Sequence, residues 1–74
     1  MNQIPTTKHL SIPNKLRQVR EELDLSQHQV AQMLNRPQSY VSRCENGIKR
    51  LDIEELESFC GIYKKPLIYF ISKE

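Results

Sequence analysis

The chain is short of the residue types from which catalytic and metal sites are most often built. Its 74 residues include no tryptophan, two glycines, two histidines and two cysteines. Two glycines are too few for a glycine-rich phosphate-binding loop. Cys44 and Cys60 are separated by fifteen residues without a CxxC motif, and His9 and His28 have no partner at ligand spacing. We therefore predict a protein that is not an enzyme and that holds no metal and no cofactor.

A long hydrophobic run is also missing, although 38% of the residues are apolar. The sequence therefore predicts neither a secretory signal peptide nor a membrane span. The two cysteines are expected to pack as small apolar residues in a reducing compartment. We expect one cytoplasmic domain, of a size at which a single core is marginal without oligomerisation.

The net charge of +2 is too small to indicate a nucleic-acid partner, but the charge is unevenly distributed. Residues 1–50 contain eight Lys or Arg and four Asp or Glu, whereas residues 51–74 contain three Lys or Arg and five Asp or Glu. The first part of the chain is therefore positive, which favours a phosphate backbone on that side.

Residues 26–46 carry the clearest helical pattern. Ser26 is a predicted N-cap, because it precedes an apolar helical stripe. That stripe consists of Val30, Ala31 and Leu34. Asn35, Arg36 and Pro37 interrupt the pattern, since proline cannot continue a helix and asparagine tolerates a positive φ. The sequence predicts a helix, a turn of about three residues, and a second helix over 38–46.

The second helix has an inward side and a polar side. The residues expected to face inward are Val41, Cys44, Glu45 and Ile48, and Gly47 is expected to end the helix in the left-handed conformation. The polar side is made of amides, hydroxyls and one arginine, namely Gln38, Ser39, Ser42, Arg43 and Asn46. A solvated helix face usually carries Glu and Lys, whereas these side chains suit the donors and acceptors of DNA base edges.

Several residues of this segment are found at matching positions in one family, namely SQ at 26–27, Ala31, Asn35, QSYVS at 38–42 and ENG at 45–47. On these residues, the segment resembles the helix-turn-helix of the Cro and lambda-repressor-like transcriptional regulators of the xenobiotic-response-element type. Matching positions extend from about Leu16 to Ile62 without a gap. The resemblance implies an all-α, compact bundle of about five short helices around a central helix-turn-helix. Pro37 stands where a capping Ser or Thr is usual and Asn35 where glycine is common, and both remain compatible with the turn.

Ahead of this segment we expect an arm and a first helix. Residues 1–12 show no helical period and are predicted to be an N-terminal arm, either loosely packed or with Lys8 at a phosphate or groove edge, and residues 13–74 form the domain. The first helix is predicted from Pro13 to about Leu23, with Leu16, Val19 and Leu23 on its inward stripe. The resemblance implies a partly buried salt bridge between Arg20 and Glu45, which would give an inward carboxylate the partner it needs.

Beyond the helix-turn-helix, Asp52 is the predicted cap of a fourth helix that ends at Gly61. Its inward residues are expected to be Ile53, Leu56, Phe59 and Cys60. A last helix over about 66–72 is apolar on more than one side, and an exposed apolar patch usually marks an interface. The resemblance implies a two-fold dimer through this helix, with Ile68, Tyr69 and Ile71 as the candidate dimer residues.

The sequence predicts specific binding of double-stranded DNA by a homodimer, with the helix over 38–46 in the major groove. Gln38 is the principal candidate for base reading, since glutamine matches the paired donor and acceptor of adenine. Ser39, Ser42 and Arg43 follow on the same face, while Tyr40 at its edge either packs against DNA or is partly buried. Phosphate contacts are expected from Gln27, Asn46, Lys49 and Arg50, with His28 as a further candidate. The resemblance also implies that Gln27 braces Gln38.

The expected role is that of a prokaryotic or phage repressor, located in the cytoplasm with the nucleoid, on a two-fold symmetric operator. The alternative is an antitoxin-type module that neutralises a partner protein through the arm or the last helix and autoregulates its operon. A third interpretation, an architectural DNA-binding protein with little sequence preference, fits the amide-rich face less well.

Overall fold

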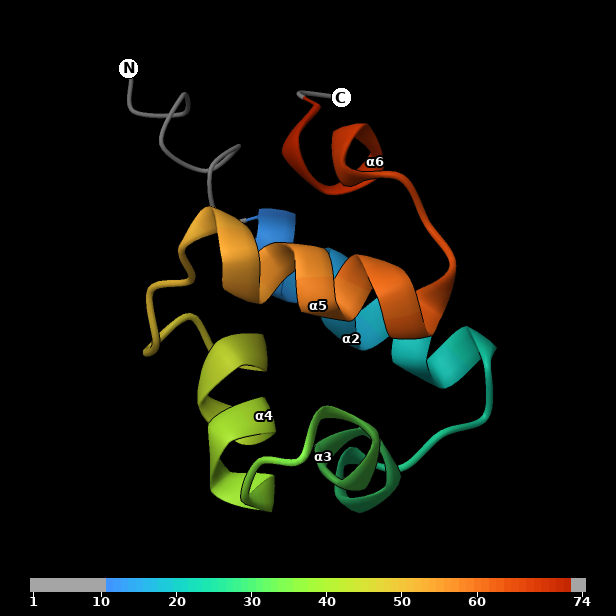
Figure 1. Ribbon diagram of the computed structural model, residues 1–74, viewed down its shortest axis with the longest axis vertical. Coiled ribbons are helices and arrows are strands. Elements are labelled where there is room, and N and C mark those ends of the chain that lie inside the picture. Colours follow the sequence, from blue (N-terminus) through green and yellow to red (C-terminus); the bar gives the residue numbers. More distant parts are fainter. Residues whose placement is uncertain (1–10, 73–74) are drawn as a thin grey trace.

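A computed structural model describes residues 11–72 and places them in five α-helices, with no strand in that part of the chain (Figure 1). The helices are α2 (Ser11–Glu22), α3 (Gln27–Leu34), α4 (Gln38–Glu45), α5 (Ile53–Tyr63) and α6 (Leu67–Ile71). The all-α fold predicted from the sequence is therefore confirmed.

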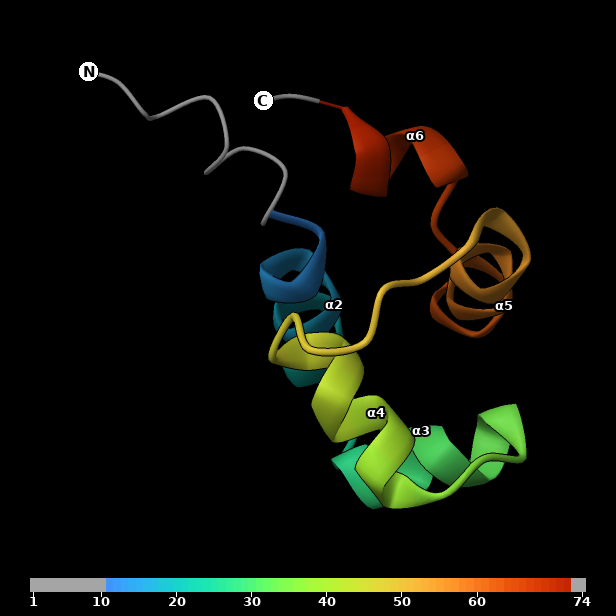
Figure 2. The same cartoon turned by 90° about the vertical axis from the view of Figure 1, so that its left-hand side faces the viewer.

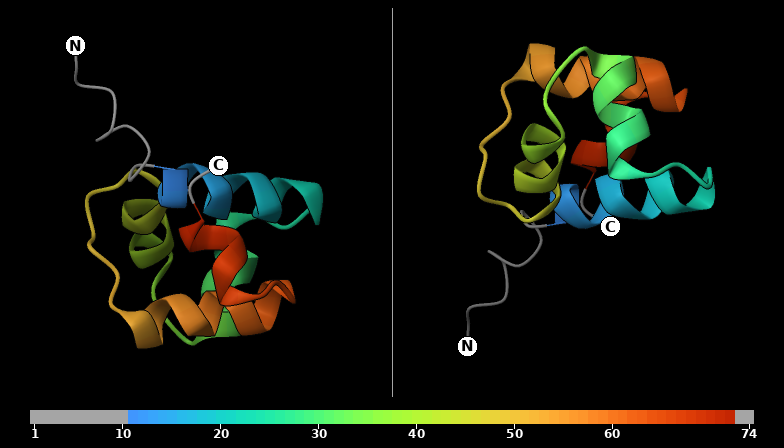
Figure 3. Two further views of the ribbon diagram at one scale, coloured as in Figure 1. Left: turned by 90° about the horizontal axis from the view of Figure 1, so that it is seen from above. Right: turned by 90° about the horizontal axis from the view of Figure 1, so that it is seen from below.

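The helices form three levels. Helices α2 and α5 run alongside each other in the middle of the molecule, the α3–α4 pair lies at one end, and α6 lies at the other end (Figures 1 and 2). Seen along the long axis, α6 lies between α2 and α5 and packs against both (Figure 3). One core joins all five helices, and its buried residues are Leu16, Val19, Val30, Ala31, Val41, Cys44, Leu56, Phe59, Tyr63 and Phe70.

Local sequence signals set most of the helix boundaries. Ser26 and Asp52 each form a capping box with the residue three positions later, so α3 and α5 begin where the sequence predicts. Asn35 has a φ of 59° and ends α3 in the left-handed conformation, while Gly47 has a φ of 75° just after α4. The three-residue turn between the two helices is confirmed.

Helix α2 begins earlier than predicted. It starts at Ser11, so Ser11 and Ile12 are helical and do not belong to the predicted arm. Pro13 is then the third helical residue, which is allowed because the first four helical N–H groups have no intrahelical acceptor. The predicted position of Lys8 falls outside the described residues.

Three residues predicted to face inward are exposed. Leu23 is 47% exposed because α2 ends before it, and Ile48 is 72% exposed because the left-handed turn at Gly47 directs the chain away from the stripe of α4. Ile53 is 53% exposed as the first residue of α5. Helical periodicity applies only within a helix, and all three residues lie at the first position of a helix or beyond its last one.

Helix α5 passes through Gly61 and does not end there as predicted. It continues to Tyr63, and Lys64 caps its C-terminus in the left-handed conformation with a φ of 57°. A glycine inside a helix costs about 1 kcal/mol relative to alanine. Burial of the Tyr63 ring against Phe59, with ring centroids 5.7 Å apart, offsets that cost.

Candidate nucleic-acid interface

The salt bridge expected from the sequence connects α2 to α4. The guanidinium of Arg20 donates from Nε to Glu45 Oε2 at 2.7 Å and from Nη2 to Oε1 at 3.0 Å. The Glu45 side chain is fully buried, whereas that of Arg20 is 13% exposed. The hydrogen bonds from this ion pair raise the pKa of Arg20 above its ordinary value, although burial opposes them. This bidentate pairing of Arg20 with Glu45 fixes α4 against α2.

Glu45 also begins a chain of side-chain hydrogen bonds that reaches the surface. Gln27, the first residue of α3, donates from Nε2 to Glu45 Oε1 at 3.0 Å. Gln38, the first residue of α4, donates from its own Nε2 to Gln27 Oε1 at 2.7 Å. A side chain at the exposed start of α4 is therefore oriented through Gln27 by the buried ion pair.

The polar side of α4 predicted from the sequence is present at the surface. Gln38, Ser39 and Arg43 are exposed and Ser42 is half-buried, whereas Val41 on the other side of the helix is fully buried. The amide of Asn46, just past the end of α4, donates to Ser42 Oγ at 3.4 Å. These side chains form a continuous set of donors and acceptors along one exposed helix face, which we call the polar face of α4.

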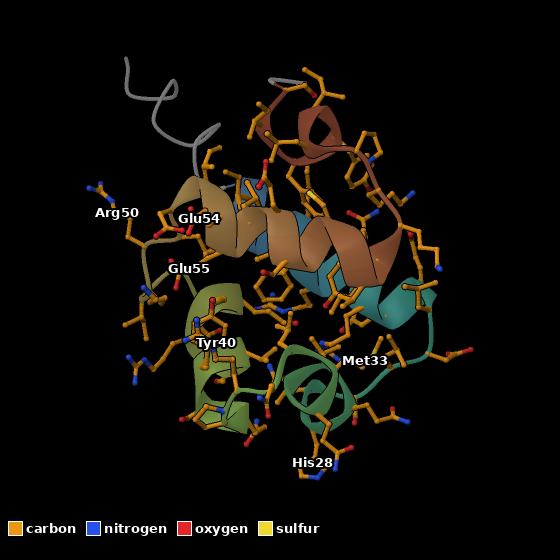
Figure 4. The ribbon with its side chains drawn as sticks, viewed as in Figure 1. His28, Met33, Tyr40, Arg50, Glu54 and Glu55 are labelled. Atoms are coloured by element: carbon orange, nitrogen blue, oxygen red, sulfur yellow. The ribbon has the colours of Figure 1, made fainter. Side chains whose placement is uncertain are left out.

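Tyr40 is partly buried, which is one of the two positions left open by the sequence. Its hydroxyl donates to Glu55 Oε2 at 3.2 Å, and its ring stacks on Phe59 with centroids 6.4 Å apart. The guanidinium of Arg36 lies 4.6 Å from the ring centroid. Figure 4 shows Tyr40 on the side of α4 toward Glu55. Tyr40 therefore joins α4 to α5 and lies at the edge of the polar face.

The residues predicted to contact phosphate differ in their availability. Asn46 and Arg50 are exposed, as is His28 near the start of α3 (Figure 4). Gln27 is half-buried and engaged with Glu45 and Gln38. Lys49 forms an ion pair with Glu55, at 3.2 Å between Nζ and Oε2.

Arg17 lies at this surface but is not among the residues chosen from the sequence. Its Nη2 donates to the backbone carbonyl of Glu45 at 3.2 Å and to Asn46 Oδ1 at 3.2 Å. Its side chain is 41% exposed. Arg17 precedes Arg20 by three residues and shares its helix face, a spacing from which the position could have been predicted. A second arginine of α2 thus lies beside the end of α4.

The last helix presents two apolar side chains to solvent. Ile68 is 61% and Ile71 46% exposed, whereas Phe70 is fully buried. Tyr69 is half-buried, with Lys15 Nζ 5.5 Å and Lys65 Nζ 4.6 Å from its ring centroid. Lys15 also donates to the carbonyls of Tyr69 and Ser72, so α2 holds the end of α6 in place.

No group of three or more His, Cys, Asp or Glu that could hold a metal ion occurs among residues 11–72. Burial raises the pKa of the Cys44 and Cys60 thiols, which favours the neutral form of both. No helix in this part of the chain is both long and apolar enough to span a membrane.

Comparison with known proteins gives one match. The family model described as Helix-turn-helix matches residues 16–70, which include all of α3, α4 and α5 and the turn between α3 and α4. No curated protein and no solved structure matches the chain.

Proposed function

The chain belongs to the helix-turn-helix family of Cro and lambda-repressor-like regulators and is a DNA-binding transcription regulator, and we propose that it is a dimeric repressor that reads a two-fold symmetric operator. In this proposal α4 enters the major groove and α3 lies across the phosphate backbone. The residues proposed to read bases are Gln38, Ser39, Ser42 and Arg43.

The observation that carries the proposal is the hydrogen-bond chain from Gln38 through Gln27 to Glu45. An exposed glutamine without a binding role is not expected to be oriented through a buried ion pair. A base-reading glutamine binds more tightly when its amide is already held in one orientation. Gln38 Nε2 is engaged with Gln27, yet an amide nitrogen carries two donors and its oxygen remains an acceptor. Those two groups suit adenine N7 and N6, a contact worth roughly 1–3 kcal/mol of discrimination.

Phosphate contacts are proposed from the edges of the polar face of α4. Arg17 and Asn46 lie together at the end of α4, and Gln27 lies at the N-terminus of α3, where the helix dipole also favours an anion. Arg50 extends this set along the loop after α4. With roughly six to ten phosphates neutralised by a dimer, the affinity would fall steeply between low and moderate salt.

Dimerisation is proposed through α6. Ile68 and Ile71 are exposed on a short helix that Lys15 fixes against α2, so two copies could bury them against each other. A dimer would double the number of base contacts and impose two-fold symmetry on the operator. Repression follows from occupancy, because a small domain bound at a promoter blocks polymerase without further contacts.

Selection from a randomised pool of duplexes with the purified protein, followed by sequencing, tests this function. The proposal predicts enrichment of a two-fold symmetric consensus. Enrichment of no sequence, with binding that only follows salt, would contradict it. Co-purification of a second small protein that binds to the exposed face of α6 would favour the antitoxin alternative over a dimeric repressor.

A further inference from the structure

Lys49 lies in the loop between α4 and α5, and its ammonium group is paired with Glu55 within the protein. The Nζ atom is 3.3 Å from Glu55 Oε1 and 3.2 Å from Glu55 Oε2, and it donates to the backbone carbonyl of Arg50 at 3.2 Å. An ammonium has three N–H donors, and two of them are used in the hydrogen bonds to Glu55 Oε1 and to the Arg50 carbonyl. The side chains of Lys49 and Glu55 are 30% and 14% exposed, so the pair is partly shielded from water.

Glu55 is held in turn from two other directions. Its Oε1 accepts from the backbone N–H of Asp52 at 3.0 Å as part of the capping box of α5. Its Oε2 accepts from the hydroxyl of Tyr40 at 3.2 Å, and the Tyr40 ring is stacked on Phe59. The carboxylate therefore joins α4, the loop and α5, and it presents two fixed oxygens to Lys49.

Arg50 differs from its neighbour. Its side chain is exposed, and its guanidinium makes no hydrogen bond or ion pair within residues 11–72. Figure 4 shows Arg50 extending outward from the loop. Of the two basic residues of the loop, Arg50 has no side-chain partner among residues 11–72, whereas Lys49 is paired with Glu55.

Building on the DNA binding proposed above, we propose that Glu55 is a positioning residue that withholds Lys49 from DNA and leaves Arg50 as the phosphate contact of the loop. Moving Lys49 to a phosphate would break the ion pair with Glu55 and the hydrogen bond to the Arg50 carbonyl, and it would leave a carboxylate facing the DNA backbone. Glu55 thus sets how many phosphates each protomer neutralises. This assignment replaces our expectation that both Lys49 and Arg50 contact the DNA backbone.

The salt dependence of affinity for a selected duplex tests this assignment. Glu55→Gln removes the charge, while glutamine still serves at this position of a capping box. The variant is expected to bind more tightly at low salt and to steepen the slope of log affinity against log salt by about 0.9 per protomer. Lys49→Met combined with Glu55→Gln is expected to return the slope to the wild-type value. Arg50→Met is expected to reduce the slope by about 0.9 per protomer.

The control is Glu57→Gln, which removes an exposed acid of the same helix and reports the long-range effect of one charge. The assignment would be overturned if Glu55→Gln steepened the slope no more than Glu57→Gln does. It would also be overturned if the combined Lys49→Met and Glu55→Gln variant lost as much slope as Arg50→Met.

A second measurement needs no DNA. Urea midpoints of Lys49→Met, Glu55→Gln and the combined variant form a double-mutant cycle. A midpoint shift in the combined variant that is smaller than the sum of the single shifts supports the ion pair, whereas additive shifts overturn it. If the cycle shows coupling but the wild type binds no duplex in a salt-dependent way, the proposed function fails, and the role of Glu55 toward DNA fails with it.

Discussion

The side-chain amide of Gln38 donates a 2.7 Å hydrogen bond to the side-chain oxygen of Gln27, which joins the first residue of α4 to the first residue of α3. Gln27 donates onward to Glu45, and Glu45 is paired with Arg20. The exposed start of α4 is therefore oriented by a buried ion pair at the other end of the same helix. Stability of the fold and orientation of Gln38 depend on the same four side chains.

The first prediction concerns the ion pair. Arg20→Ala is expected to reduce the free energy of unfolding by roughly 3–5 kcal/mol, because it removes both guanidinium hydrogen bonds from the fully buried Glu45 carboxylate. Glu45→Ala is expected to cost toward the lower end of that range, since Arg20 is partly exposed and still donates to the carbonyl of Leu25. Urea unfolding gives both values. Unchanged midpoints for both variants would show that the pair does not stabilise the fold.

A second prediction concerns Tyr63. The residue is only 3% exposed, yet its hydroxyl has no hydrogen-bond partner among residues 11–72. A buried donor without a partner costs about 1–3 kcal/mol. Tyr63→Phe removes the hydroxyl and keeps the ring, so it is expected to raise the free energy of unfolding by about 1 kcal/mol. A clear loss of stability would indicate that the hydroxyl is hydrogen-bonded.

The third prediction is a pH dependence. The backbone N–H of Asp52 lowers the pKa of Glu55, and the bonds from Lys49 and Tyr40 act in the same direction. A depressed carboxyl pKa stabilises the fold above the unfolded-state value, about 4.3, and this contribution is lost as pH falls through the folded-state value. The stability difference between wild type and Glu55→Gln is therefore expected to shrink below about pH 4. Urea midpoints measured from pH 7 to pH 3 test this, and a constant difference would refute it.

The fourth prediction concerns the dimer. Ile68→Ser and Ile71→Ser are each expected to weaken self-association about 100-fold, because a two-fold interface loses the same apolar side chain twice, at roughly 1.5 kcal/mol each. Ile53→Ser is the matched control, since Ile53 is also exposed but lies on α5. Sedimentation equilibrium gives the dissociation constants. Equal effects of the three substitutions would exclude α6 as the specific interface.

Much of the fold could be predicted because its boundaries have local causes. Ser26 and Asp52 cap helices by hydrogen bonds that span three residues. Asn35 and Gly47 adopt the left-handed conformation, which asparagine tolerates and which glycine permits because it has no Cβ. The inward stripes of α3 and α4 follow from periodicity. The predictions of inward-facing residues failed at helix ends. Leu23, Ile48 and Ile53 continue the apolar spacing of a helix, but they lie at or beyond its end and are exposed.

The candidate site could be predicted only in part. Gln38 and the polar face of α4 follow from residue type and spacing, and the pairing of Arg20 with Glu45 was implied by the family resemblance. The engagement of Lys49 with Glu55 and the position of Arg17 depend on contacts between separate elements. Side chains that meet only through the packing of helices leave no period in the sequence, so the availability of each charge could not be predicted.

The most direct test of the central claim is to measure whether Gln38 reads one base pair in each half-site. Affinities of wild type, Gln38→Ala and the control Gln18→Ala, whose side chain is exposed on α2, are measured for duplexes in which each base pair of the selected site is replaced in turn. We expect Gln38→Ala to lose roughly 1–3 kcal/mol of discrimination at a single position per half-site and to keep it at the others, while Gln18→Ala behaves as wild type. Undiminished discrimination by Gln38→Ala at every position would contradict the claim.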